Sequence, residues 1–382
     1  KHLILSEIKM SSNYFAYDYL IVGSGLFGSV FAHQMNKNGK KCLVIEKRKH
    51  IGGNIYCENI DGIIVHHYGA HIFHTNDEKI WNFVNHFTKF NNFIHSPVAF
   101  YKNQFYNLPL NMNTFHQLWN VSTPDEAKRI ITSQICNENL DSLQGFEKHV
   151  VSTVGRDIYE KLIKGYSEKQ WGRNSNNLPS FIIKRLPLRF TFDNNYYNDK
   201  YQGIPMGGYN PLIENLLNGI EVKKGINFFE NRDYWNSISK KIIYTGKIDE
   251  FYNYKHGELD YRSLVFEHKK IQKKNNQPYA VINYTDIEIP FTRTIEHKYF
   301  HPTNVPHTIV TTEFPVEHNK DNEPYYPVND NTNTELFNKY KAIAQNETKV
   351  IFGGRLAEFR YYDMHQVIAS ALKMALKEIT ES

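Results

Sequence analysis

The sequence predicts an α/β protein in which a Rossmann-like dinucleotide-binding domain is built from both ends of the chain and holds an inserted helical domain and an antiparallel β-sheet domain. Three features of the 382 residues lead to this prediction. Near the N-terminus, a strand, a glycine turn, a helix and a second strand follow one another within about 30 residues, the spacing of a dinucleotide-binding unit. A mainly helical stretch follows, and then a β-rich one. The end of the chain returns to a short strand, a glycine pair and an amphipathic helix.

Composition excludes several classes of protein. Apolar residues make up 41% and charged residues 22% of the chain, which is typical of a globular protein and excludes a disordered one. The net charge of +5 is not gathered into a basic arm, so we expect no nucleic-acid partner. No apolar run reaches the ~20 residues of a membrane span, so we expect no membrane association. The three cysteines, Cys42, Cys57 and Cys136, lack CxxC spacing, which argues against a disulfide framework and favours a reducing compartment, the cytoplasm.

The first glycine turn is the strongest local motif. An apolar run from Asp18 to Val22 stops at Gly-Ser-Gly-Leu-Phe-Gly, residues 23–28, and a helix is expected from Ser29 to Asn38. A second strand then ends in Glu46. The glycines let the backbone approach a pyrophosphate, and the helix N-terminus offers free N–H groups to it. Glu46 follows at the distance of a ribose-binding acid, and its charge disfavours a 2′-phosphorylated cofactor.

A second glycine pair follows this acid, in His50-Ile-Gly-Gly-Asn54. NAD and FAD both fit the first turn. In flavoproteins, a second nest after the ribose acid contacts the remaining phosphates of the dinucleotide. The pair therefore favours FAD over NAD.

The rest of the chain divides by its patterns. Residues from about Asp77 to Gly172 carry apolar and aromatic positions at helical spacing, and residues 181–330 are richer in β-branched and aromatic residues. A helix is expected near Asp363, with Gln366 completing a capping box. We therefore expect an FAD-binding domain (17–76, 205–255 and 331–382), a helical substrate-lid domain (77–180) and a sheet domain (181–204 and 256–330).

Four histidines, His66, His67, His71 and His74, lie within one short segment. A metal site needs further ligands, and no nearby carboxylate or thiolate completes a set, so we expect no metal. Structural histidines, or one histidine against a flavin ring, are the better interpretation.

Aromatic residues and arginines supply the other candidates. Tyr166 and Trp171 fall near a predicted helix end, where core packing is the ordinary role of such side chains. Arg185 and Arg293 each stand beside apolar residues. A surface position is the default for an arginine, but two that converge would bind a pyrophosphate bidentately. The sequence contains no GxSxG, HExxH, Walker A or SxxK motif, so the chemistry would belong largely to the flavin.

Nine stretches together resemble the UDP-galactopyranose mutases of the bacterial type. They run in the family's order and are Ile21–Gly28, His50–Asn54, Tyr68–Thr75, Lys164–Gly172, Lys184–Phe190, Asp193–Tyr197, Tyr284–Phe300, Pro324–Pro327 and Gly353–Met364. The first is shared by many flavoproteins. The Lys-Gln-Trp-Gly, Arg-Leu-Pro and Thr-Arg-x-x-Glu-His-Lys-Tyr-Phe sequences are far more specific.

The resemblance implies an isomerase that interconverts UDP-galactopyranose and UDP-galactofuranose, the precursor of galactofuranose in surface glycans. In this family, N5 of reduced FAD displaces UDP from the sugar, so that covalent catalysis divides one difficult step into easier ones. The resemblance also implies a cytoplasmic homodimer.

Site residues are carried over by position. Arg185 and Arg293 would hold the diphosphate, and His71 would lie against the flavin. The substrate would be bound by Tyr166, Trp171, Tyr196, Tyr326, Tyr361 and Asp363. The cofactor would contact Gly23, Gly25, Leu26, Phe27, Gly28, Glu46, Lys47, Gly53, Asn54, His71, Arg355, Asp363 and Met364. Two further substrate positions depart from the family pattern: Leu162, where many members carry Phe beside the uracil, and His95, where many carry Asn.

Two rival interpretations fit part of the sequence. A flavin oxidase of the amine-oxidase type would share the dinucleotide unit and the second glycine pair. A nucleotide-sugar-binding protein could retain FAD structurally. Oxygen consumption with an amine would support the first, and tight UDP binding without isomerisation would support the second.

Overall fold

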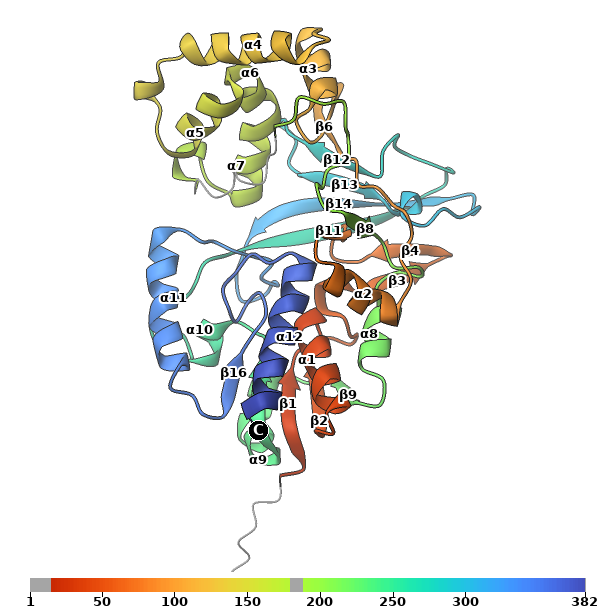
Figure 1. The fold of residues 1–382 in the computed structure, drawn as a ribbon, viewed down its shortest axis with the longest axis vertical. Coiled ribbons are helices and arrows are strands. Elements are labelled where there is room, and N and C mark those ends of the chain that lie inside the picture. The colour runs from red at the N-terminus through yellow and green to blue at the C-terminus, as the bar shows by residue number, and fades with distance from the viewer. Residues whose placement is uncertain (1–14, 179–187, 382) are drawn as a thin grey trace, which may run out of the picture.

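A five-stranded parallel sheet forms one end of the molecule (Figure 1). The computed structural model describes residues 15–178 and 188–381. The strand order is β16-β10-β1-β2-β9, with the helices α1 and α12 side by side on one face. These elements are β1 (Tyr17–Val22), α1 (Leu26–Lys37), β2 (Cys42–Glu46), β9 (Glu221–Lys224), β10 (Ser239–Tyr244), β16 (Val350–Phe352) and α12 (Met364–Glu381). The Rossmann-like domain built from both ends of the chain is therefore confirmed.

The chain ends meet because each supplies one face of the same core. Val30 and Phe31 of α1 and Ile368 of α12 are fully buried in one cluster, and burying each such side chain contributes about 1.5–3 kcal/mol. The contact is closest at Gly353, where an added Cβ would lie 2.2 Å from the ring of Phe27. The helix expected from Ser29 begins three residues earlier, because extended Gly25 is its N-cap.

A seven-stranded sheet lies above the parallel one in Figure 1. Its order is β15-β11-β14-β13-β12-β6-β7, antiparallel except for the β12–β6 pair. The strands are β6 (Val98–Tyr101), β7 (Gln104–Asn107), β11 (Tyr261–Ile271), β12 (Val281–Tyr284), β13 (Arg293–Glu296), β14 (Thr308–Glu317) and β15 (Tyr326–Pro327).

The stretch expected to be mainly helical also contains a hairpin, β6–β7, which the sequence did not predict. Its two-residue turn is Lys102-Asn103, and both residues have positive φ, 44° and 66°. Such a turn matches the twist of paired strands but is usually marked by glycine. Without that glycine the pattern gave no hairpin signal.

A helical layer caps the far side of this sheet (Figure 1). Its helices are α3 (Met112–Trp119), α4 (Pro124–Cys136), α5 (Gly145–Val154), α6 (Arg156–Ile158) and α7 (Gly165–Trp171), with a π-helical turn η3 (Tyr159–Lys164) before α7. The helix start expected at Pro124 is confirmed, and Thr123 and Glu126 form a reciprocal capping box. Phe115, Phe146 and Tyr159 fill the core between the helices.

Smaller elements connect these layers. The paired strands are β3 (Cys57–Ile60) with β4 (Ile63–His66) and β5 (Phe73–Thr75) with β8 (Tyr201–Gly203). The remaining helices are α2 (Glu78–Phe87), α8 (Asn210–Leu216), α9 (Arg232–Ile238), α10 (Ile248–Phe251) and α11 (Asn331–Ala344). Short 3-10 turns are η1 (Gly53–Ile55), η2 (Leu140–Ser142), η4 (Ser175–Asn177), η6 (Phe228–Asn231) and η7 (His297–Tyr299). Within residues 15–178 and 188–381, no helix is long and apolar enough to cross a membrane.

Candidate active site

The glycine turn between β1 and α1 leaves room for a ligand on one side and none on the other. Gly23 has φ +108°, and a Cβ on Gly28 would lie 2.1 Å from the Gly23 carbonyl oxygen. A Cβ on Gly25 would meet no atom within 4 Å, so this residue faces open space. The second glycine pair comes close, because a Cβ on Gly53 would lie 3.1 Å from Cα of Gly25. The two nests therefore share one cradle, as an extended diphosphate requires.

Glu46 is held at the end of β2 beside this cradle. Its carboxylate accepts hydrogen bonds from the Ser24 amide at 2.9 Å, the Ser24 hydroxyl at 2.7 Å and the Arg48 amide at 2.9 Å. Only 5% of Glu46 is exposed. These donors fix the position of the carboxylate beside the glycine turn. The glycine motif by itself gives no signal for this role of Ser24.

A cavity of about 670 Å³ runs from the glycine turn toward the seven-stranded sheet. All the predicted cofactor residues except Asp363 line it, namely Gly23, Gly25, Leu26, Phe27, Gly28, Glu46, Lys47, Gly53, Asn54, His71, Arg355 and Met364. Its volume and paired glycine nests fit a dinucleotide. Asp363 lies just beyond, and its amide donates to Oε1 of Gln366 at 2.9 Å, the expected half of a capping box at α12.

Three wall segments of the cavity were missed by sequence analysis: 226–229, 244–247 and 318–324. The second could have been found, because Thr245-Gly246 directly follows β10, and ligands in such sheets bind at the carboxyl ends of the strands. The third lies in the loop between β14 and β15, and Glu323 connects this loop to the residues that follow β2. Its carboxylate lies 2.8 Å from Nζ of Lys47 and 3.3 Å from the Arg48 guanidinium.

His71 lines the cavity and lies between β4 and β5 in the chain. Its Nδ1 lies 2.8 Å from the Gly69 carbonyl oxygen, and its amide donates to Nδ1 of His66 at 3.1 Å. Burial lowers the pKa of His71 to about 4, so the ring is neutral near pH 7. No group of three or more metal-ligating side chains is placed to hold an ion in the part of the chain that the structure describes.

Arg293, at the start of β13, is held by three groups. Its guanidinium donates to the Tyr166 hydroxyl at 2.9 Å and to Oδ1 of Asn283 at 3.1 Å, and lies 3.7 Å from the Glu313 carboxylate. Burial opposes the cation, but Tyr166 and Glu313 outweigh it and raise the pKa of Arg293 well above its usual value. Burial also raises the pKa of Tyr166 to about 12. The site therefore keeps a permanent cation beside a neutral phenol.

Glu313 was not predicted as a site residue. Its side chain is 2% exposed, and Oε1 has no hydrogen-bond partner among the described residues. A buried carboxylate is costly unless it is paired, so its position beside Arg293 ties the two together. A lone Glu in a β-rich stretch gives no sequence signal for this.

Aromatic rings gather around Arg355. The rings of Tyr326 and Tyr361 are stacked at 5.2 Å, and the Arg355 guanidinium lies 5.3 Å from the Tyr361 ring centre. Arg355 also donates to the carbonyl oxygens of Tyr325 and Tyr362, at 3.2 and 2.8 Å. Since Arg355 lines the cavity, this stack continues the cavity wall.

Trp171 and Leu162 lie on the helical side. Both are buried in the core of the helical layer, at 8% and 6% exposure, and the Trp171 ring is 6.5 Å from that of Tyr326. Trp171 is thus a core residue that also borders the aromatic stack. Arg185 lies outside the described residues.

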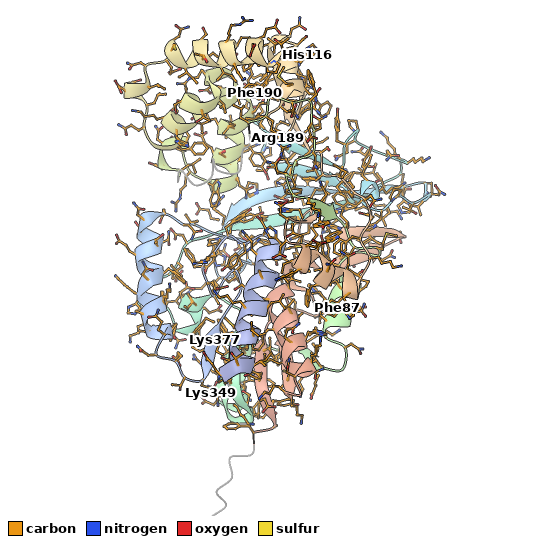
Figure 2. The ribbon with its side chains drawn as sticks, in the orientation of Figure 1. Phe87, His116, Arg189, Phe190, Lys349 and Lys377 are labelled. Carbon is orange, nitrogen blue, oxygen red and sulfur yellow. The ribbon has the colours of Figure 1, made fainter. Side chains whose placement is uncertain are left out.

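Tyr196 and His95 lie side by side, with ring centres 5.4 Å apart, and the Tyr196 amide donates to the His95 carbonyl oxygen at 2.8 Å. Burial lowers the pKa of His95 to about 3, so its ring is neutral. Arg189 fixes this loop by donating to the carbonyl oxygens of Asn195 and Tyr196. Figure 2 shows Arg189 and Phe190 where the helical layer meets the seven-stranded sheet.

The chain matches known families and proteins over most of its length. The model of the family "UDP-galactopyranose mutase" matches residues 161–361, more than half of the chain, and that of the "NAD(P)-binding Rossmann-like domain" matches residues 21–87. A dTDP-fucopyranose mutase of Escherichia coli is 38% identical, covering 93% of this chain and 97% of its own. A probable UDP-galactopyranose mutase of Klebsiella pneumoniae is 37% identical, covering 93% of both chains. A UDP-galactopyranose mutase of Mycoplasma genitalium is 33% identical, covering 98% of both.

Solved structures agree at the level of the fold. A crystal structure of a reduced UDP-galactopyranose mutase gives a TM-score of 0.74 at 11% identity, covering 96% of this chain and 94% of that one. A putrescine oxidase bound to putrescine gives 0.55 at 11% identity, covering 95% and 99%. The likeness to the oxidase is one of fold alone.

Proposed function

The chain belongs to the UDP-galactopyranose mutase family, and from this premise we propose that it interconverts UDP-galactopyranose and UDP-galactofuranose with bound, reduced FAD. One observation carries the proposal beyond family membership. The Arg293 cation, fixed by Tyr166 and Glu313, lies near the cofactor cavity, since its charge and that of Arg355 both act on His71, which lines that cavity. A sugar diphosphate could there place its anion on Arg293 and its sugar toward the cofactor.

The residues of this chain would divide the work as follows. Arg293, with Arg185, would bind the diphosphate and stabilise it as it leaves the sugar. Tyr326 and Tyr361 would donate to its oxygens, since burial raises the pKa of Tyr326 well above its usual value and keeps its proton in place. The nucleotide and sugar would be bordered by Tyr166, Trp171, Tyr196, Leu162, His95 and Asp363.

FAD fits the cavity that the two glycine nests and Glu46 define. The Glu46 carboxylate would accept hydrogen bonds from the ribose hydroxyls, and the amides at the start of α1 would face the diphosphate. Arg355, Met364 and neutral His71 would border the flavin end. When bound and reduced, the flavin would supply a nucleophilic nitrogen, the covalent catalysis that a change of ring size in a nucleotide sugar needs.

A second nucleotide sugar has support from one comparison. The E. coli relative at 38% identity is a dTDP-fucopyranose mutase, so the same reaction on a dTDP-6-deoxysugar is the alternative. Both substrates present a diphosphate to Arg293, and they differ in the base, the ribose and C6 of the sugar.

The test is a turnover assay on the FAD-loaded protein reduced with dithionite. UDP-galactofuranose should be converted to UDP-galactopyranose, resolved by chromatography, with no stoichiometric consumption of reductant. The oxidised protein should be nearly inactive. Faster conversion of dTDP-fucofuranose would show that the dTDP-6-deoxysugar is the preferred substrate. A folded, FAD-loaded protein that converts neither would overturn the proposal, and oxygen consumption with an amine would favour the oxidase.

Further expectations concern the assembly, location, role and domain division of the enzyme. The enzyme would act as a homodimer in the cytoplasm and supply galactofuranose for surface glycans. Its domains would be the FAD-binding domain (17–76, 205–255, 331–382), the helical lid (77–180) and the sheet domain (181–204, 256–330), with β6 and β7 of the second range paired into the sheet.

A further inference from the structure

Lys169 is surrounded by four backbone carbonyl groups. Its Nζ donates to the carbonyl oxygens of Tyr284 and Asp286 at 2.8 Å, Ile289 at 2.9 Å and Phe291 at 3.0 Å. An ammonium group has three N–H donors, so four acceptors use all of them. Burial lowers the pKa of Lys169 to about 8, and the Asp286 carboxylate opposes this shift. The side chain is therefore mainly charged at neutral pH, and charge-assisted hydrogen bonds are the strong ones.

All four carbonyl groups belong to the segment 284–291, which joins β12 to β13 and ends two residues before Arg293. Lys169 itself lies on α7 between two substrate-site candidates, three residues after Tyr166 and two before Trp171. The Lys169 side chain thus connects α7, which carries Tyr166 and Trp171, to the segment that leads into Arg293 on β13.

The surrounding contacts show how closely these two segments meet. A Cβ on Gly165 would lie 2.3 Å from the Thr285 carbonyl oxygen, so the helix backbone rests directly on the segment. The Thr285 hydroxyl donates to the Lys161 carbonyl oxygen at 2.6 Å. Without the ammonium, four carbonyl groups would lose a donor at this contact, and α7 would lose its side-chain bonds to segment 284–291 between Tyr166 and Trp171.

We propose that Lys169 is a positioning residue for the substrate site, in which its ammonium group holds α7 against segment 284–291 so that Tyr166 meets Arg293 and Trp171 meets Tyr326. This inference rests on the proposed function. Lys169 acts through Tyr166 and Trp171. The lysine clasp is the Lys169 ammonium group together with the four carbonyl groups that it binds, those of Tyr284, Asp286, Ile289 and Phe291.

The chain offers a matched control in Lys298. Its Nζ donates to three carbonyl oxygens, of Lys274 at 2.9 Å, Val305 at 2.8 Å and His307 at 3.1 Å, and 5% of the residue is exposed. None of these three acceptors is a candidate site residue. Lys298→Met should therefore cost stability as Lys169→Met does, without loosening the substrate site.

The experiment measures the affinity of the reduced, FAD-loaded protein for UDP and for dTDP by calorimetry, together with KM and kcat. Lys169→Met should weaken binding of the nucleotide that the wild type binds by about tenfold, the scale expected for losing hydrogen bonds to a charged group. KM should rise by a similar factor, kcat should change less, and flavin content should stay the same. Lys298→Met should keep wild-type affinity within about twofold.

The outcomes separate the two proposals. Wild-type nucleotide affinity in folded Lys169→Met, or an equal loss in Lys298→Met, would overturn the lysine clasp. If Lys169→Met does not fold, Lys169→Gln keeps an uncharged donor and should show the same loss to a smaller degree. Its wild-type affinity would also overturn the clasp. A wild type that binds UDP or dTDP but isomerises neither sugar would overturn the proposed function alone.

Discussion

In the glycine cradle of the dinucleotide-binding region, the groups that meet are close in the sequence, whereas in the substrate-facing region they come from distant segments. Ser24 and Glu46 are 22 residues apart, but Tyr166 and Arg293 are 127 apart. The first region is fixed by backbone geometry at glycines, which a short motif encodes. The second depends on long-range side-chain contacts: Tyr166 and Lys169 join α7 to the β12–β13 region, and Glu313 pairs with Arg293 on the neighbouring strand. Damage to the first should therefore affect the cofactor, and damage to the second the substrate.

The largest effect is expected at Arg293. Arg293→Ala should lower turnover by about 10²–10³-fold, since it removes a preorganised positive charge from the leaving diphosphate. Flavin content should remain normal, because Arg293 does not line the cofactor cavity. Turnover and the visible flavin spectrum measure the two effects.

A suitable control for this change is Arg156→Ala. Arg156 also pairs with carboxylates, those of Glu138, Glu147 and Glu160, but within the helical layer. Its loss should leave turnover within about twofold. Near-normal turnover in Arg293→Ala would contradict the assigned role of this residue.

Substitutions in the glycine cradle should affect the flavin, whereas Arg293→Ala should leave flavin content normal. Gly28→Ala forces a Cβ to within 2.1 Å of the Gly23 carbonyl oxygen, so it should destabilise the protein by several kcal/mol and reduce flavin content. Gly25→Ala meets no protein atom within 4 Å. It should leave the stability of the flavin-free protein unchanged and weaken FAD binding alone.

Urea unfolding of the flavin-free variants and FAD titration test this pair. Equal stability of Gly28→Ala and wild type would mean that the backbone relaxes, and unchanged FAD affinity in Gly25→Ala would mean that the cradle does not hold the diphosphate.

The same contrast explains what the sequence could predict. The β1–α1–β2 unit and the glycine nests were predictable because their spacing is local and each glycine has a geometric reason. Glu313 and the loop 318–324 reach the site through long-range packing, which leaves no mark on their own segments. The β6–β7 hairpin was missed for a different reason, because Lys102-Asn103 occupies a turn where glycine would have been the signal.

Trp171 lies on the border between packing and binding. Trp171→Ala should weaken UDP binding by about tenfold without release of FAD, since its ring borders the stack with Tyr326. Trp235 is equally buried, at 7% exposure against 8%, but packs below the parallel sheet. Trp235→Ala should cost stability and leave UDP affinity unchanged. Loss of flavin or unfolding in Trp171→Ala alone would show that its role is purely one of core packing.

The smallest effect concerns a contact between the two regions. His297 is fully buried; its Nδ1 accepts from the His66 amide at 3.2 Å, and its Nε2 lies 2.6 Å from the Thr311 hydroxyl oxygen. An amide donor can use only Nδ1 as acceptor, so the ring proton is on Nε2 and is donated to Thr311. Burial lowers the pKa of His297 to about 3, whereas in the unfolded chain it is about 6.5.

Below pH 6.5 the unfolded chain therefore binds a proton that the folded protein does not, and stability is lost as the pH falls toward 3. Between pH 7 and pH 6 this one group should lower the free energy of unfolding by roughly 0.7 kcal/mol. His297→Gln keeps a donor and an acceptor but cannot titrate, so its loss of stability over that interval should be smaller than that of the wild type by this amount. Urea unfolding at the two pH values measures the difference.

Burial also lowers the pKa values of His71 and His95, to about 4 and about 3, so these two residues contribute to the pH dependence in the same direction. Some loss of stability between pH 7 and pH 6 should therefore remain in the variant. An identical pH dependence in both proteins would mean that His297 is not held neutral, and that the contact between the two regions is looser than the structure indicates.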